Sequence, residues 1–301
     1  MNAFPPDPEE ATAAGAPAHG EIPAATRVGA VSLTVADLGR SVDYYEHTIG
    51  LSVNAHEASR ATLGAGTEDL LVLVEQPGAR PVRGYCGLYH FALLLPTRPD
   101  LARWLAHAAR DREPLAGMAD HFVSEAIYLS DPDSHGIEIY ADRPRALWEG
   151  QVAARMGTDP LDLEGLLGEL DDPATAPFDG QPFGTTMGHV HLQVSQIPPT
   201  VAFYRDVAGF GLMAEYGWQA AFLAAGGYHH HVGANTWRSG GAGPPQPGAA
   251  ALRRYEIVLP DEAGRDALVE RLEAAGHEIE EHADGPLVRD PSRNAFVLLV
   301  D

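Results

Sequence analysis

The chain has 301 residues with 20 basic and 42 acidic side chains, so its formal net charge at neutral pH is −22. Every basic residue is arginine, and the absence of lysine excludes Schiff-base catalysis and a Walker-type phosphate site. Nucleic acids and anionic membranes bind clustered positive charge, so we expect neither as a partner.

The single cysteine, Cys86, excludes an intrachain disulfide and a cysteine-based zinc site. No apolar run approaches the roughly 20 residues that a membrane-spanning helix needs. Residues 1–26 are rich in Pro, Ala and Glu and have neither the positive nor the apolar region of a signal peptide. We therefore expect a disordered tail at 1–26 and a cytoplasmic protein, either monomeric or homodimeric.

An internal repeat organises the rest of the chain. The segment GAVSLTVADLGRSVDYYEHTIGL at 29–51 is repeated as GHVHLQVSQIPPTVAFYRDVAGFGL at 188–212. Val31 matches Val190 and Tyr45 matches Tyr204 at a constant offset of 159 residues, which also pairs the Asp-Pro at 131–132 with that at 290–291. The repeat predicts two homologous domains, 27–142 and 185–301, joined by a linker at 143–184 with one helix near 161–170.

Each half divides again into two modules. Segments that start near Val28, Leu88, Met187 and Leu252 each begin with a short alternating strand, continue as a helical stretch and end in further strands. This order predicts an α+β fold of four βαβββ modules, paired into two cup-shaped mixed sheets. Modules one and two make up the first domain, and modules three and four the second.

Strand alternation indicates which side chains enter a cup. In module three one face carries apolar residues, and the other carries His189, His191 and Gln193. The matching inward residues of module one are Ala30, Ser32 and Thr34. A purely structural role predicts similar residues in both copies, so this divergence indicates a functional site that only one copy carries.

Two inward positions in each module are suited to ligands, one on the first strand and one on the last. They hold His90 and Glu138 in module two, and His189 and one of His229–His231 in module three. Module one offers Ala30 and the apolar run 70–74, and module four offers Glu256 and Val297. A lone strand histidine is commonly a satisfied core residue, but a carboxylate such as Glu138 inside an apolar strand needs a partner or a metal. His90, Glu138 and His189 together form a two-histidine, one-carboxylate set, which leaves open positions on Fe(II).

Three further features are candidates for catalysis. If the tract His229–His231 lies on a strand, His229 and His231 share the cup face, and one of them is an acid/base candidate near neutral pH. A polar edge strand is the alternative explanation of this tract. His121 and Tyr128 precede the Glu138 strand, where Tyr128 is placed to bond a metal-bound oxygen and His121 to orient or deprotonate a substrate hydroxyl. Ordinary strand packing explains Tyr128 equally well.

The segments HVHLQV, FYRDVAGF, GGYHHHVGANTW and YLSDPDSHGIEIYADRP carry a family resemblance. Over residues 27–301 the chain resembles the vicinal oxygen chelate superfamily, which includes glyoxalases, extradiol ring-cleaving dioxygenases and bleomycin-binding proteins. More narrowly, it is similar to two-domain bacterial proteins called catechol-2,3-dioxygenases. The resemblance implies Fe(II) bound by His90, Glu138 and His189, an acid/base residue in the histidine tract with His231 as first choice, and a catecholate contact from Tyr128. It also implies a substrate site formed by His191, His229, Tyr228, Asn235 and Trp237.

One departure from the family pattern concerns the order of the ligands. Typical extradiol enzymes take all three ligands from consecutive C-terminal modules, whereas here the glutamate module comes first and the ligands straddle both halves. The site must then form between modules two and three, as in the exchanged arrangements among glyoxalases.

The leading hypothesis is an Fe(II)-dependent extradiol dioxygenase that acts on a small catechol-type aromatic with O2. The first alternative is a glyoxalase-like isomerase or hydrolase that uses Mn, Ni, Co or Zn on the same ligands. The second is a non-catalytic protein that binds a metal or an aromatic antibiotic. The ligand set accepts several divalent ions, so the sequence leaves the metal open.

Overall fold

The computed structural model describes residues 20–301 and contains two eight-stranded mixed sheets, as the sequence predicts. Sheet A consists, in order, of β11 (Gly211–Tyr216), β12 (Ala220–Ala224), β13 (Val232–Asn235), β10 (Thr186–Gln193), β6 (Gly87–Leu94), β9 (Gly136–Asp142), β8 (Ser124–Ser130) and β7 (Gly117–Asp120). Sheet B consists of β16 (Ile279–Glu280), β17 (Leu287–Arg289), β18 (Ala295–Val300), β15 (Leu252–Leu259), β1 (Arg27–Val35), β4 (Leu71–Glu75), β3 (Arg60–Gly64) and β2 (Ser52–His56). A short parallel pair joins β5 (Arg80–Pro81) to β14 (Ala249–Ala250).

The two sheets do not coincide with the two halves of the chain. Antiparallel pairing of β6 with β10 joins module two to module three in sheet A. Antiparallel pairing of β1 with β15 joins module one to module four in sheet B. Each sheet therefore takes one module from each half, so the predicted halves are sequence repeats and neither forms a sheet alone.

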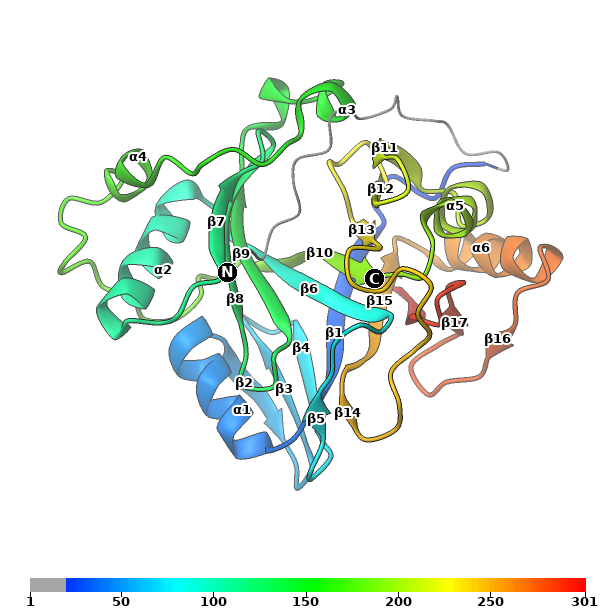
Figure 1. Cartoon of the computed structure of the whole chain (residues 1–301), viewed down its shortest axis with the longest axis horizontal. Helices are drawn as coiled ribbons and strands as arrows, with labels where there is room; N and C mark the ends of the chain where they lie inside the picture. Colours follow the sequence, from blue (N-terminus) through cyan, green and yellow to red (C-terminus); the bar gives the residue numbers. More distant parts are fainter. Residues whose placement is uncertain (1–19) are drawn as a thin grey trace.

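The helices begin at capping residues that the sequence supplies. Helices α1 (Leu38–Tyr44), α2 (Arg98–Asp111) and α6 (Glu262–Ala274) follow Asp37, Thr97 and Asp261, whose side chains each accept a first-turn backbone N–H. Helix α5 (Ile197–Val201) has proline in its first turn. Single π-helical turns, Tyr45–Ile49 and Ala202–Val207, extend α1 and α5. In Figure 1, α1 and α2 lie on one side of the strands and α5 and α6 on the other.

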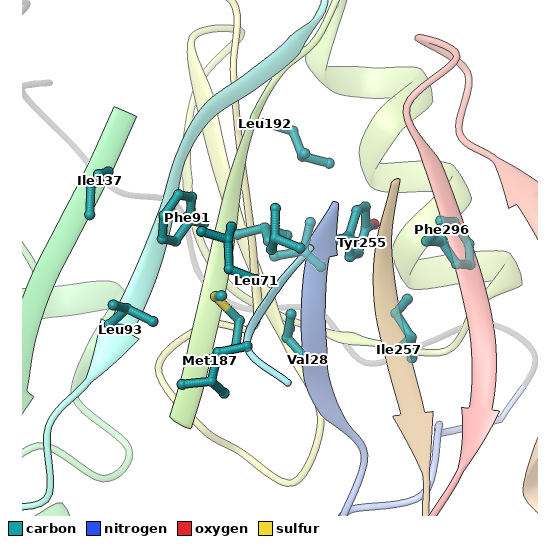
Figure 2. Close-up of a cluster of buried hydrophobic side chains, with 14 of the residues drawn as sticks. Val28, Leu71, Phe91, Leu93, Ile137, Met187, Leu192, Tyr255, Ile257 and Phe296 are labelled. Atoms are coloured by element: carbon teal, nitrogen blue, oxygen red, sulfur yellow. The ribbon is translucent and has the colours of Figure 1, made fainter. Parts of the chain in front are cut away.

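The core joins both sheets into one body. Side chains from β1, β6, β10, β15 and β18 meet in a single buried cluster, in which Figure 2 shows Val28, Phe91, Leu192, Tyr255 and Phe296. Burying a side chain of this size stabilises the fold by roughly 1.5–3 kcal/mol. Packing of this density fixes the positions of the strands that carry the polar residues described below.

Two expectations about the connecting segments need correction. Of the tail predicted to be disordered, residues 20–26 are described, and they pack against the fold. Ile22 is buried in the core, and its N–H donates to the carbonyl of Gly209. Residues 1–19 lie outside the described part. The linker contains a 3-10 turn (Arg145–Leu147) and two short helices, α3 (Val152–Arg155) and α4 (Leu163–Leu167), rather than one helix. No helix within residues 20–301 is both long enough and apolar enough to span a membrane.

Candidate metal centre

Three buried side chains converge on the concave face of sheet A. One ligand atom each from His90 on β6, Glu138 on β9 and His189 on β10 lies within 4.8 Å of the other two. Glu138 Oε2 is 3.0 Å from His90 Nε2 and 3.2 Å from His189 Nε2. A two-histidine, one-carboxylate group of this kind can hold a divalent metal.

The strand register explains why these residues meet. Across four adjacent strands, one row of paired residues reads His189, Ala92, Glu138 and Tyr128. His90 belongs to the next row, directly opposite His191. Ala92 is fully buried between His189 and Glu138, and its small side chain leaves space between their reactive atoms.

A glycine beside His90 also shapes the site. A Cβ atom on Gly136 would lie 2.0 Å from the carbonyl oxygen of Tyr89 and 3.1 Å from the Cβ atom of His90. Glycine therefore allows β9 to approach β6 closely, two residues before Glu138.

The charges of the group suit a cation. Burial alone favours the neutral acid, but the imidazoles of His189 and His90 lower the pKa of Glu138 well below its usual range. Burial lowers the pKa of His189 to about 4, so its imidazole is neutral at pH 7. His90 Nε2 is buried 3.0 Å from Glu138 Oε2 but forms no hydrogen bond of good geometry among the described residues. An ionised carboxylate and neutral imidazoles are the forms that bind metals, so this donor set fits a divalent ion.

A cavity of about 570 Å³ opens in front of this group. His90 and Glu138 lie in its wall, whereas His189 lies behind it and is 1% exposed. Of the other residues that the sequence analysis selected, four line the cavity: His121, Tyr128, His191 and Trp237.

Tyr128 and His121 form a hydrogen-bonded chain beside Glu138. Tyr128 pairs with Glu138 across β8 and β9, and its hydroxyl lies 2.6 Å from His121 Nε2. His121 Nδ1 lies 2.6 Å from the carbonyl oxygen of Gly157, which can only accept, so Nδ1 carries the proton. In the neutral ring Nε2 is then the acceptor of the Tyr128 hydroxyl. Burial and the Glu138 charge raise the pKa of Tyr128 well above its usual range, so this hydroxyl keeps its proton at pH 7.

The expectation that His231 faces the cavity is wrong. Its Nδ1 accepts from the backbone N–H of Ala225, and His230 is the member of the tract that lines the cavity. The two-residue period of a strand does not apply to residues 229–231, because β13 begins only at Val232. The histidines instead follow a turn in which Gly226 and Gly227 have positive φ.

His229 joins His230 to an acidic residue. Its Nε2 is 2.9 Å from Asp142 Oδ1, and its Nδ1 is 2.8 Å from His230 Nδ1. The carboxylate accepts from Nε2–H, so Nδ1 of a neutral His229 accepts from His230 Nδ1–H. This arrangement leaves His230 Nε2 with its lone pair free to accept a proton.

Three residues expected to bind substrate do not line the cavity. His229 is fully buried behind His230, and the Tyr228 hydroxyl lies 2.8 Å from that of Tyr140. Asn235 is fully buried, and its Oδ1 accepts from the N–H of Trp237. His229 and Asn235 thus support side chains in the wall, whereas Tyr228 bonds Tyr140, which lies outside it.

The corresponding positions of sheet B cannot hold a metal. Pairing of β1 with β15 and of β15 with β18 places Ala30, Arg254 and Val297 where sheet A has His189, His90 and Glu138. The sequence alignment had matched Glu256 to His90, but the register matches Arg254 to it. Glu256 instead accepts a hydrogen bond from the N–H of Ala30.

Part of the wall comes from the linker, which no sequence pattern had marked. Residues 156–159 line the cavity together with the loops that follow β5 and β13. The Gly157 carbonyl holds His121, the Met156 carbonyl accepts from the Tyr216 hydroxyl, and Asp159 bridges to Asp120 beside β7. These contacts are made by backbone groups, which no side-chain motif records.

Residues 27–139 and 186–298 both match the family model described as the Glyoxalase/Bleomycin resistance protein/Dioxygenase superfamily. The chain belongs to this superfamily. One relative in it, the Catechol-2,3-dioxygenase of Bacillus subtilis (strain 168), is 42% identical over 281 residues, which cover 91% of this chain and 97% of that protein.

Solved structures show the same fold at low identity. A Bacillus subtilis crystal structure matches 94% of this chain and 86% of its own with a TM-score of 0.65 and 15% identity. Maize glyoxalase I matches 92% of both chains with a TM-score of 0.57 and 15% identity. The superfamily and the fold predicted from the repeat are thereby confirmed.

Proposed function

We propose that this protein is an extradiol dioxygenase that uses Fe(II) and O2 to open the ring of a catechol. The observation that carries the proposal is the convergence of His90, Glu138 and His189 at the wall of an aromatic-lined cavity. The identity of 42% to a Catechol-2,3-dioxygenase over nearly the whole length supports the same reaction class.

The two histidines and the glutamate would hold the iron. When bound, Fe(II) supplies positive charge that acidifies a catechol hydroxyl, together with open coordination positions for the diol and dioxygen. All other functions in the site belong to side chains of the protein.

Tyr128 and His121 would control one proton. The Tyr128 hydroxyl lies beside Glu138, and His121 Nε2 is 2.6 Å from it. A substrate hydroxyl near Glu138 can donate to the Tyr128 oxygen, while the Tyr128 hydroxyl donates to His121 Nε2, so the two side chains can pass on the substrate proton. His121 is itself fixed by the Gly157 carbonyl.

His230 would accept a second proton. It lies in the cavity wall with its Nε2 free of any hydrogen bond among the described residues, while Asp142 and His229 fix its tautomer. His191, also in the wall, has a buried Nε2 without a hydrogen-bond partner in the described chain, so it can bond a polar group of the substrate.

The test is anaerobic reconstitution with Fe(II), followed by a panel of catechols and an oxygen electrode. We expect stoichiometric O2 uptake together with the yellow ring-opened product. Glu138→Gln should abolish both, because it removes the charged ligand. Turnover of an α-oxo-aldehyde adduct without O2 uptake would instead support a glyoxalase-type isomerase, and absence of ring opening across the panel would refute the proposal.

A further inference from the structure

We propose that the cavity selects catechols that carry a carboxylate, and that Arg238, assisted by Arg83, binds this carboxylate. The inference rests on the proposed function and adds the substrate class to it.

The first observation concerns the partners of the arginines. Half of the 20 arginines, among them Arg40, Arg98 and Arg143, form an ion pair with a carboxylate. Arg83 and Arg238 line the cavity, and within residues 20–301 neither forms an ion pair. In a chain with 42 acidic residues and 20 arginines, two unpaired guanidiniums at one cavity are available for an external anion.

The second observation is that both arginines belong to one wall. The loop after β5 is held to the loop after β13 by the hydrogen bond from the Cys86 N–H to the Gly243 carbonyl. A Cβ atom on Gly84 would lie 3.7 Å from the carbonyl oxygen of Arg238. Arg83 and Arg238 are therefore on neighbouring loops, at the exposed mouth of the cavity.

The third observation is an aromatic path from the metal centre to this wall. The ring of Tyr89 is centred 5.3 Å from that of His90 and 5.2 Å from that of Trp237. Trp237 in turn lies 5.4 Å from His191 and directly precedes Arg238. An aromatic ring bound at the metal centre has Tyr89 and Trp237 beside it and Arg238 beyond them.

The carboxylates of the cavity reinforce this orientation. Asp133 is paired with Arg40 at 2.6 Å, and Glu138 belongs to the metal centre. Asp159 is exposed and lines the cavity from the linker, on a different segment from the arginines. An anionic substituent is attracted to the arginine loops and repelled by Asp159, and a guanidinium offers the paired donors that match a carboxylate.

The test compares catechol with 3,4-dihydroxybenzoate and 3,4-dihydroxyphenylacetate. Affinities are measured anaerobically by calorimetry on the Fe(II)-loaded full chain, and KM values are measured in air. Arg238→Gln and Arg83→Gln are compared with wild type. Arg112→Gln is the matched control, because Arg112 is exposed, lies outside the cavity and makes no ion pair within the described chain.

We expect the wild type to bind at least one acid more tightly than catechol. The ratio of acid to catechol affinity should fall about five- to tenfold in Arg238→Gln, less in Arg83→Gln, and not at all in Arg112→Gln. No preference for either acid in the wild type, or an equal ratio in all four proteins, would overturn the inference. Acid binding without ring opening would leave the inference standing and refute the proposed reaction, so the two failures are distinguishable.

Discussion

The hydroxyl of Tyr128 lies 2.6 Å from Nε2 of His121, and the other nitrogen of that ring is held by a carbonyl of the linker. Three segments are thereby connected: strand β8, the loop before it and the connection between the sequence repeats. The backbone of residue 157 determines which nitrogen of His121 faces the tyrosine, and so the direction in which the Tyr128 proton points.

Replacing Tyr128 with Phe should reduce kcat about 10- to 100-fold, because a substrate hydroxyl loses its hydrogen-bond acceptor and the link to His121. Iron content should stay at the wild-type level, since Tyr128 is not among the three ligand residues. Steady-state kinetics together with metal analysis measure both quantities. Wild-type turnover by the variant would show that Tyr128 only packs against the sheet.

Divalent iron should stabilise the folded protein. At a free concentration 100 times its Kd, a ligand that binds only the folded state adds about 2.7 kcal/mol, which for a chain of this length raises Tm by about 4 °C. EDTA should reverse the increase, as followed by anaerobic thermal unfolding.

Glu138→Gln should remove the stabilisation by iron, and Glu256→Gln supplies the control. Glu256 is also a largely buried glutamate, but it lies in sheet B and accepts a backbone N–H. If iron no longer raised the Tm of either variant, iron binding would not depend specifically on the centre in sheet A.

The two neighbouring histidines should differ in function. His230→Gln is expected to lower kcat about 100-fold, because the side chain in the cavity wall can no longer accept a proton. His231→Gln should keep kcat within about twofold, since His231 lies outside the wall and bonds Ala225. Initial rates of the two variants provide the comparison, and a larger loss in His231→Gln would restore the assignment made from the sequence.

Asp290 should make stability depend on pH. Burial raises the pKa of its carboxyl to about 6, although the side chain of Asn294 and two backbone N–H groups favour the ionised form. The unfolded value is about 3.9, so the folded state binds this proton more tightly. The resulting stability is present below about pH 4 and is lost as the pH rises through 6.

Between pH 4 and 7 the unfolding free energy of the wild type should therefore fall relative to Asp290→Asn by about 2 kcal/mol. Urea unfolding in EDTA measures this change without any contribution from metal binding. Parallel pH profiles for the two proteins would contradict it.

The sequence predictions of side-chain direction were right within regular strands and wrong outside them. His90, Glu138 and His189 lie within regular strands, where a period of two holds, and comparison of the repeats selected them correctly as a group that can hold a metal. His231 was misplaced because it lies outside β13 and follows two glycines with positive φ. Glu256 was matched with His90 because each follows a tyrosine in a similar strand sequence, but the ladders pair Arg254 with Ser32 as they pair His90 with His191.

Other features depend on contacts that leave no local pattern. The pairing of modules across the halves depends on which strand edges meet, and the four modules have similar sequences. The carbonyl of Gly157 and the unpaired state of Arg238 likewise depend on the neighbours that the fold brings to them.

The pairing of modules across the halves also bears on the origin of the chain. Two separate copies of one half, exchanging modules in this way, would build two identical sites related by twofold symmetry. Joining the copies in one polypeptide lets each position in one sheet mutate independently of its equivalent in the other. Sheet B has Ala30, Arg254 and Val297 at the equivalent positions, so within residues 20–301 this ligand group occurs in sheet A alone and sheet B supports it.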